Sequence, residues 1–372
     1  MPPRSRRADR PAQRRLMRFW WRFILVALIA YLGYTIWLGG AYRDVEPFVA
    51  GQCIAVAAPP GPEDMAILPG GHAAIVSSQD RRDRMAQGGL YLYDMTSRPG
   101  RFTPIPLPPS LPFHPHGMSL FATADGQIFL HVINHRASDR HTVEIFLLQL
   151  AADGTPTLRH RGSVSSDLFV HPNGIAAAGP ESFYLTNDRG SGPRWMHMVE
   201  NLLQLSRSTV VYHDGRFARL VAEDIAFANG IEVSADGGTL LTASTLWRML
   251  LAYARDPASG MLVRTGSLSL PLGPDNVRRD SDGDLWIAGH PNAFAFIGHA
   301  MDADKESPST VLRAGRDSRG VMRVQEVFAD PGSLLSGASV AVHHQGRLLI
   351  GAVFQPTILD CQLEPERFRD AG

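Results

Sequence analysis

Five acidic and amide residues recur at one position of a repeated sequence pattern, where together they could hold a metal ion. They are Glu63, Asn173, Asn229, Asp275 and Asn276. Hard oxygen donors without thiolates favour calcium or magnesium, and a ligand set rich in amides favours calcium. Taken singly, each of these residues is also typical of a turn or a strand start. The hypothesis of a single calcium ion therefore depends on all five residues occupying the equivalent position in their copies of the repeat.

Four histidines occur in two short motifs of the same pattern. The segment FHPHGMS contains His114 and His116, and the segment HVINHR contains His131 and His135. Antiparallel hairpin strands return to the same end, so we expect His116 and His135 to be neighbours beside the ion. A histidine that titrates near neutrality suits a general base that activates water. We predict catalytic roles for His116 and His135, whereas a lone histidine more often has a structural role.

The repeated pattern is a β-hairpin with a tight turn. In the segment FANGIEVSADGGTLLTAS, residues 227–244, two apolar strands flank an Asp-Gly turn. Copies follow one another about every 50 to 60 residues, close to the period of propeller blades. They begin at Glu63, His116, Asn173, Asn229, Asp275 and Ser339. The pattern predicts an all-β fold, a six-bladed β-propeller, over the alternative of unrelated hairpins in a β-sandwich. Innermost strands of a propeller line one channel, which would gather the five oxygen donors.

The N-terminus has the composition of a membrane anchor. Residues 1–18 contain seven arginines and one acid, and the chain is uncharged from Phe23 through Ala41. A helix of that length spans roughly 28 Å, about one hydrocarbon core. We predict a basic cytoplasmic segment at 1–18, an uncleaved signal-anchor helix at 19–41 and a six-bladed β-propeller domain at 42–372. A cleaved signal peptide is the alternative. Because arginines stay cytoplasmic, we expect the propeller on the periplasmic face of a bacterial inner membrane.

The two cysteines lie at opposite ends of the predicted propeller. In a closed propeller the first and last strands commonly share a blade, which would bring Cys53 and Cys361 together. Export across a membrane favours oxidation, so we predict a disulfide. The alternative is a pair of buried free thiols.

Composition excludes some functions. The chain has 36 basic and 36 acidic residues, and no basic stripe lies outside the N-terminus, so we expect no nucleic-acid partner. It also lacks the Gly-x-Ser-x-Gly motif of serine hydrolases.

Residues 193–205 have apolar side chains at helical spacing. We expect this short amphipathic helix to cover core surface, with a lid or a membrane contact as the alternative.

Several segments together resemble the paraoxonase/arylesterase family. They are GPEDMAILPGG, FHPHGMSLF, VINH, NGIAAAGPESFYLTND, FANGIEVSADG, PDNV and DLWIAGHPN, and they keep the family's order from about Cys53 to Cys361. The resemblance implies a six-bladed propeller with a calcium-dependent lactonase and aryl-esterase site. It assigns the catalytic calcium to the same five oxygen donors, a histidine dyad to His116 and His135, and the closing disulfide to Cys53 and Cys361.

One departure from the family concerns its second, structural calcium ion. The resemblance places two ligands of that ion at Asp64 and at the carbonyl of Met118. Where the family has an acid directly after the third-blade asparagine, this chain has Gly174. We therefore predict that a second ion is absent or loosely held. Propellers of the gluconolactonase and strictosidine-synthase-like type resemble the pattern more distantly and typically use one ion.

These observations predict a calcium-dependent hydrolase of small lactones and aryl esters, in which a metal-polarised carbonyl is attacked by a water that His116 activates. One alternative is a sugar-lactone hydrolase of the gluconolactonase type. Another is a membrane-tethered propeller that only binds a partner, because propellers host many functions.

Overall fold

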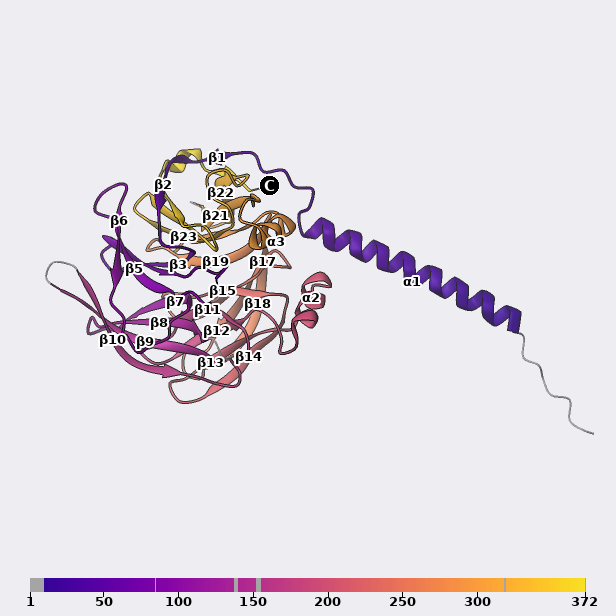
Figure 1. The fold of residues 1–372 in the computed structure, drawn as a ribbon, viewed down its shortest axis with the longest axis horizontal. Helices are drawn as coiled ribbons and strands as arrows, with labels where there is room; N and C mark the ends of the chain where they lie inside the picture. The colour runs from indigo at the N-terminus through magenta and orange to yellow at the C-terminus, as the bar shows by residue number, and fades with distance from the viewer. Residues whose placement is uncertain (1–9, 84, 137–139, 152–154, 318, 372) are drawn as a thin grey trace, which may run out of the picture.

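The fold is a six-bladed β-propeller with one long N-terminal helix (Figure 1). The computed structural model describes residues 10–371 except 84, 137–139, 152–154 and 318. Within these residues, six antiparallel sheets surround a central channel. The innermost strand of each sheet lies nearest the middle of the propeller (Figure 1). The propeller predicted from the sequence is confirmed.

Each blade has four strands that run from the channel outward. Blades one and two contain β3 (Pro62–Ile67), β4 (Ala73–Ser78), β5 (Gly89–Asp94), β6 (Arg101–Ile105), β7 (Pro115–Ala122), β8 (Ile128–His135), β9 (His141–Leu150) and β10 (Pro156–Val164). Blades three and four contain β11 (Pro172–Ala177), β12 (Phe183–Asn187), β13 (Ser208–His213), β14 (Ala218–Ile225), β15 (Ala228–Val233), β16 (Thr239–Ser244), β17 (Met249–Arg255) and β18 (Leu262–Ser269).

Blades five and six include strands from both ends of the chain. Blade five contains β19 (Gly273–Arg279), β20 (Leu285–His290), β21 (Ser309–Arg316) and β22 (Met322–Asp330), extended by β1 (Phe48–Val49) and β26 (Arg369–Asp370). Blade six contains β23 (Ala338–His344), β24 (Arg347–Ala352), β25 (Thr357–Leu363) and, as its outermost strand, β2 (Gly51–Ala57). Strand β2, from near the N-terminal end of the propeller, therefore completes the last blade and closes the ring.

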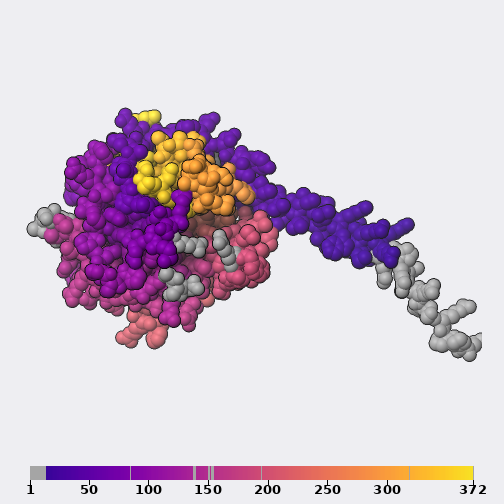
Figure 2. All heavy atoms as spheres, viewed as in Figure 1, coloured from indigo at the N-terminus to yellow at the C-terminus, as the bar shows by residue number. Residues whose placement is uncertain are grey.

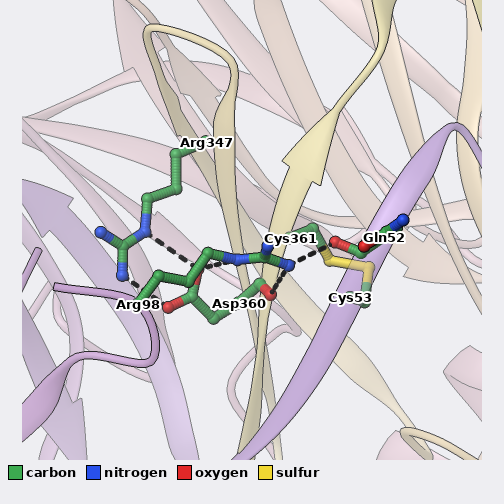
Figure 3. The surroundings of a disulfide bond; sticks show 6 residues. All are labelled: Gln52, Cys53, Arg98, Arg347, Asp360 and Cys361. Atoms are coloured by element: carbon green, nitrogen blue, oxygen red, sulfur yellow. Dashed lines mark hydrogen bonds and ion pairs between the residues drawn. A yellow bond between two sulfur atoms is a disulfide. The ribbon is translucent and has the colours of Figure 1, made fainter.

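A disulfide joins the two strands that close the ring (Figure 3). Cys53 on β2 lies directly opposite Cys361 on β25, and their sulfurs are bonded. This confirms the predicted pairing. The neighbouring Asp360 is fully buried and accepts hydrogen bonds from Arg347 and Tyr93. Because the bridge spans 308 residues, it would stabilise the fold by about 5 to 6 kcal/mol in the chain-entropy model.

The apolar core lies between the blades. Each of six buried clusters joins one pair of neighbouring sheets. Between blades one and two, for example, Ile75 and Leu90 pack with Leu130 and Phe146. The stacked sheet faces therefore carry the hydrophobic stabilisation, and the channel is left for polar side chains.

Every innermost strand has a bulge at the same place. The register against the second strand shifts around Glu63 on β3, around His116 and Gly117 on β7, and at the equivalent positions of β11, β15, β19 and β23. A bulge takes residues out of the regular alternation and redirects their side chains. The bulged residues of the other four strands are Asn173, Gly174, Asn229, Gly230, Asp275, Asn276 and Ser339.

Helix α1 (Arg10–Leu38) extends away from the propeller (Figures 1 and 2). Its residues Arg14–Leu38 have the length and hydropathy of a membrane span or a signal sequence, and almost none of this segment is buried in the protein. The helix starts and ends earlier than the predicted span of 19–41. It ends before Gly39 and Gly40, and Gly40 adopts a left-handed φ of 75° that suits glycine at a helix C-terminus.

Two short helices lie near the base of α1. Helix α2 (Arg194–Leu202) confirms the predicted helix, but its packing is opposite to our expectation. Trp195 and Met198 are 62% and 68% exposed, whereas His197 and Glu200 are buried and bond to the backbone of Gly190. The helix therefore does not cover core surface with its apolar face. Helix α3 (Ala293–Met301), capped by the side chain of Asn292, was not predicted.

Candidate active site

The five predicted metal ligands meet in the channel. Glu63 lies on β3, Asn173 on β11, Asn229 on β15, and Asp275 and Asn276 on β19, and all five are buried. The Nδ2 of Asn276 donates to the Oε1 of Glu63 over 3.0 Å, which links blade five to blade one. The bulges described above present these side chains at the same end of the channel. We refer to the five residues as the oxygen cage.

Glycines allow the innermost strands to approach one another at the cage. A Cβ atom on Gly117 would lie 2.4 Å from the carbonyl oxygen of Asn173, and one on Gly174 would lie 2.6 Å from that of Asn229. Real Cβ atoms do not approach backbone this closely. A glycine after the functional residue therefore lets each strand pack against the next, which explains the repeated His-Gly and Asn-Gly pairs of the sequence.

Three oxygens of the cage have no hydrogen-bond partner. They are Oε2 of Glu63, Oδ1 of Asn173 and Oδ1 of Asn229, all buried. Leaving a buried polar atom without a partner costs about 1–3 kcal/mol. The two asparagine oxygens bear this cost, whereas the Glu63 oxygen has an ion pair with Arg81 at 3.5 Å. All three oxygens fit the coordination of a hard cation such as calcium. No group of three or more His, Cys, Asp or Glu side chains that could hold a metal occurs among the described residues, and three of the cage residues are asparagines.

The electrostatics of Glu63 also fit a cation. Burial raises the pKa of its carboxyl to about 8, with Asp64 and Asp275 adding to the rise and the nearby Arg81 opposing it. A cation in the cage would favour the ionised carboxylate. The side chain of Asp275 is oriented by a hydrogen bond between its Oδ2 and the Nε2 of His290, at 3.0 Å. Such a contact fixes the orientation of a metal ligand.

His116 and His135 form the predicted pair. The Nδ1 of His116 lies 2.7 Å from the Nε2 of His135, and the Nε2 of His116 faces the Oε1 of Glu63 at 3.6 Å. Burial lowers the pKa of both imidazoles well below the usual value, and nearby charges including Arg81 lower it further. This direction differs from the titration near neutrality that we expected of a general base. The lowered pKa favours the neutral imidazole, which can accept a proton.

A third histidine continues the pair and was missed from the sequence. His141 on β9 lies directly opposite His135 on β8, and their Nδ1 atoms are 2.9 Å apart. If His116 keeps its Nε2 lone pair toward the cage, its Nδ1–H donates to His135. His135 then donates through its own Nδ1–H to His141. These three histidines are hydrogen-bonded in a row because β8 and β9 pair in this register, which cannot be predicted from the sequence.

The other two histidines of the motifs lie outside the site. His114 pairs through Nδ1 with the side chain of Gln79 at 2.9 Å. His131 is fully buried on β8 and packs its ring against Phe183. These positions agree with the structural role that we expected for a lone histidine.

Arg81 is a further residue that the sequence analysis did not single out. Its Nη2 lies 3.5 Å from the Oε2 of Glu63, and its Nη1 lies 3.3 Å from the Nδ1 of His116. The second contact competes with the bond between His116 and His135, which is shorter at 2.7 Å. Arg81 places a positive charge beside both the cage and the histidine pair.

Asp64 and the carbonyl of Met118 lie together, as the resemblance implied, but they contact an arginine. The guanidinium of Arg278 bonds to both carboxylate oxygens of Asp64 and donates to the Met118 oxygen over 2.8 Å. Gly174 is the bulged residue next to Asn173, and its neighbourhood has no room for a side chain.

Sequence comparison identifies the family. The profile of the family described as Arylesterase matches residues 56–363. The chain belongs to the arylesterase family. Serum paraoxonase/arylesterase 1 of Mus musculus is 32% identical over 336 residues, covering 86% of this chain and 91% of the relative. The human protein of the same name is 32% identical over 334 residues, covering 87% and 92%. Human serum paraoxonase/lactonase 3 is 30% identical over 340 residues, with the same coverage.

Membership in the arylesterase family makes this protein an esterase or lactonase. The matched residues contain the oxygen cage, the three histidines, Arg81 and Arg278. The family also implies the use of calcium, and the unpartnered oxygens of the cage fit that ion.

Proposed function

We propose that this arylesterase hydrolyses lactones and aryl esters with one calcium ion held by the oxygen cage, Glu63, Asn173, Asn229, Asp275 and Asn276. One observation carries the proposal: two buried amide oxygens without a hydrogen-bond partner and the buried Glu63 carboxylate lie in the channel beside the histidine pair. Calcium bound there would supply Lewis-acid polarisation of the substrate carbonyl.

In the proposed reaction, His116 and its neighbours move the proton. Water adds its oxygen to the carbonyl carbon while the Nε2 of His116 accepts the proton. The Nδ1–H of His116 is fixed by His135, and His135 is fixed by His141. The imidazolium then returns its proton to the leaving alkoxide or phenolate as the ester bond breaks. The products are a carboxylic acid and an alcohol, joined in one molecule when the substrate is a lactone.

Arg81 would stabilise the negative charge that forms on the substrate carbonyl oxygen during attack. Its guanidinium lies within 3.5 Å of Glu63 and His116, so it adds positive charge where the carbonyl oxygen becomes negative. Preorganised positive charge of this kind stabilises a developing oxyanion.

A substrate panel tests the proposal. The full-length protein in detergent is assayed on aryl esters, acyl lactones and sugar lactones, each with chelator and with added calcium. We expect aryl esters and acyl lactones to be hydrolysed with calcium and not with chelator. Hydrolysis of sugar lactones alone would support the gluconolactonase type. The absence of any hydrolysis would support a propeller that only binds, and activity that survives full metal removal would overturn the mechanism.

We further propose that α1 anchors the protein and that the propeller lies on the extracytoplasmic side, such as the periplasmic face of a bacterial inner membrane. The arginine block before the apolar segment supports this orientation, and so does the disulfide. The Tyr31 hydroxyl of α1 bonds to the Leu203 carbonyl after α2, which places the exposed apolar face of α2 near the anchor.

The redox state of the cysteines tests this orientation. Intact cells are lysed into denaturant that contains an alkylating reagent and no reductant, so that the buried Cys361 is accessible, and the mass of the full-length protein is measured. We expect neither Cys53 nor Cys361 to be alkylated, and both to be alkylated after reduction. Alkylation of both cysteines before reduction would place the propeller in a reducing compartment and contradict the proposed side.

A further inference from the structure

The guanidinium of Arg278 is a buried charge of the channel with several partners. Its side chain is 11% exposed, and it bonds to both carboxylate oxygens of Asp64 and to the Met118 carbonyl. Its Nη1 also lies 3.6 Å from the Oε2 of Glu232. A buried charge is tolerated only when partners satisfy it, and Arg278 has partners on three sides.

These contacts connect four different blades. Arg278 belongs to β19, Asp64 to β3, the Met118 carbonyl to β7, and Glu232 to β15. Innermost strands of a propeller share few hydrogen bonds with one another, so a central cation that binds several of them holds the ring together. A metal ion with carboxylate and carbonyl ligands would make the same connections.

The space around Arg278 does not fit a second metal ion. Its guanidinium already occupies the position that Asp64 and the Met118 carbonyl define. A third carboxylate cannot be supplied from Gly174, since a Cβ atom there would lie 2.6 Å from the Asn229 carbonyl oxygen. The Thr186 hydroxyl also donates to that oxygen over 2.7 Å, which fixes the backbone in place.

Arg278 also separates the cage from solvent at the other end of the channel. A cavity of about 340 Å³ opens at the C-terminal ends of the innermost strands. Arg278, Glu232, Trp286 and His343 line this cavity, whereas none of the oxygen-cage residues does. The guanidinium and its partners therefore lie between the cage and this cavity.

We infer that Arg278 is a covalently tethered cation that takes the place of a second metal ion and forms the floor of the active site. The propeller then keeps its central cross-link when metal is removed. The number of bound ions, which we expect to be one per chain, rests on the proposed function; the structural role of Arg278 does not.

The test compares Arg278→Ser with Arg279→Ser in the full-length protein in detergent. Arg279 is the next residue on β19 and bonds to the Gly283 carbonyl instead of Asp64, so it is the matched control. Thermal unfolding is followed by circular dichroism with chelator and with millimolar calcium, and bound calcium per chain is measured by mass spectrometry.

With chelator, we expect Arg278→Ser to unfold roughly 4–7 °C below Arg279→Ser, because it leaves a buried carboxylate without its partner. Millimolar calcium should restore part of that difference, since Asp64 and the Met118 carbonyl would be free to bind it. Two calcium ions per wild-type chain would overturn the inference, and so would equal unfolding temperatures of the two variants.

The remaining outcomes are also decisive. If Arg278→Ser does not fold, Arg278→Lys against Arg279→Lys gives the same comparison with a smaller shift, because lysine keeps the charge without the forked geometry; equal stability of that pair overturns the inference. If the wild type binds no calcium but Arg278→Ser still unfolds earlier than its control, the inference stands and the calcium-dependent function fails.

Discussion

Glu63→Gln protein is expected to lose calcium binding and, with it, hydrolysis of lactones and aryl esters. Glu63 supplies one of the two carboxylates of the oxygen cage, and its buried Oε2 accepts no hydrogen bond and has only an ion pair with Arg81 at 3.5 Å. Glutamine has nearly the same shape but no charge, so the cage keeps its packing and loses half of its formal negative charge. Loss of even an outer-shell partner of a metal costs about 10–100-fold in affinity, and loss of a charged ligand should cost at least that much.

Isothermal titration with calcium and the rate on a phenyl ester measure this effect. The matched control is Glu232→Gln, which removes a carboxylate from the same channel but lies beside Arg278 and outside the cage. We expect its calcium affinity to stay near that of the wild type. Equal loss of affinity in both variants would mean that only the net charge of the channel matters, and unchanged affinity in Glu63→Gln would remove Glu63 from the cage.

His116→Gln protein is expected to bind calcium and to turn over about 10²–10⁴-fold more slowly at saturating calcium. That range is the usual contribution of a positioned general base. The Nε2 of His116 faces the cage, and glutamine has no lone pair of comparable basicity at that place. His141→Phe removes only the end of the histidine chain, so its turnover should fall less.

The readout is kcat at saturating calcium together with calcium stoichiometry. His344→Gln is the matched control, because His344 lines the cavity at the opposite end of the channel. A His116→Gln protein that turns over as fast as His344→Gln would exclude the proposed base. A His116→Gln protein that no longer binds calcium would instead assign His116 to the metal site.

Much of the fold is readable in the sequence because the blade repeats. Asp236 and Gly237 mark one turn, and equivalent hairpins recur from Glu63 to Ser339. Repetition also predicted that Cys53 and Cys361 would meet, since a closed ring brings the first strand to the last blade. The apolar face of α2 was predicted to be buried and is exposed, because the spacing of Trp195 and Met198 identifies a face but not what covers it.

The oxygen cage was predicted for the same reason as the fold. Residues at one phase of a repeat must lie at one level of the channel, and Glu63, Asn173 and Asn229 share that phase. The bulges around them, which direct the side chains to the axis, depend on hydrogen-bond register between strands. That register is visible only in the structure.

The sequence alone therefore determined the number of blades, the ring closure and the set of oxygen donors, because all three follow from periodicity. Only the tertiary structure placed His141 beside His135, Arg81 beside Glu63 and Arg278 against Asp64. Each of these contacts involves a residue outside the repeated position of the pattern, namely His141, Arg81 or Arg278. Long side chains such as arginine reach across blades in directions that spacing does not specify. The position of a charged side chain in the buried channel depends on the residues that pair with it. Those residues come together only when the chain closes into a ring.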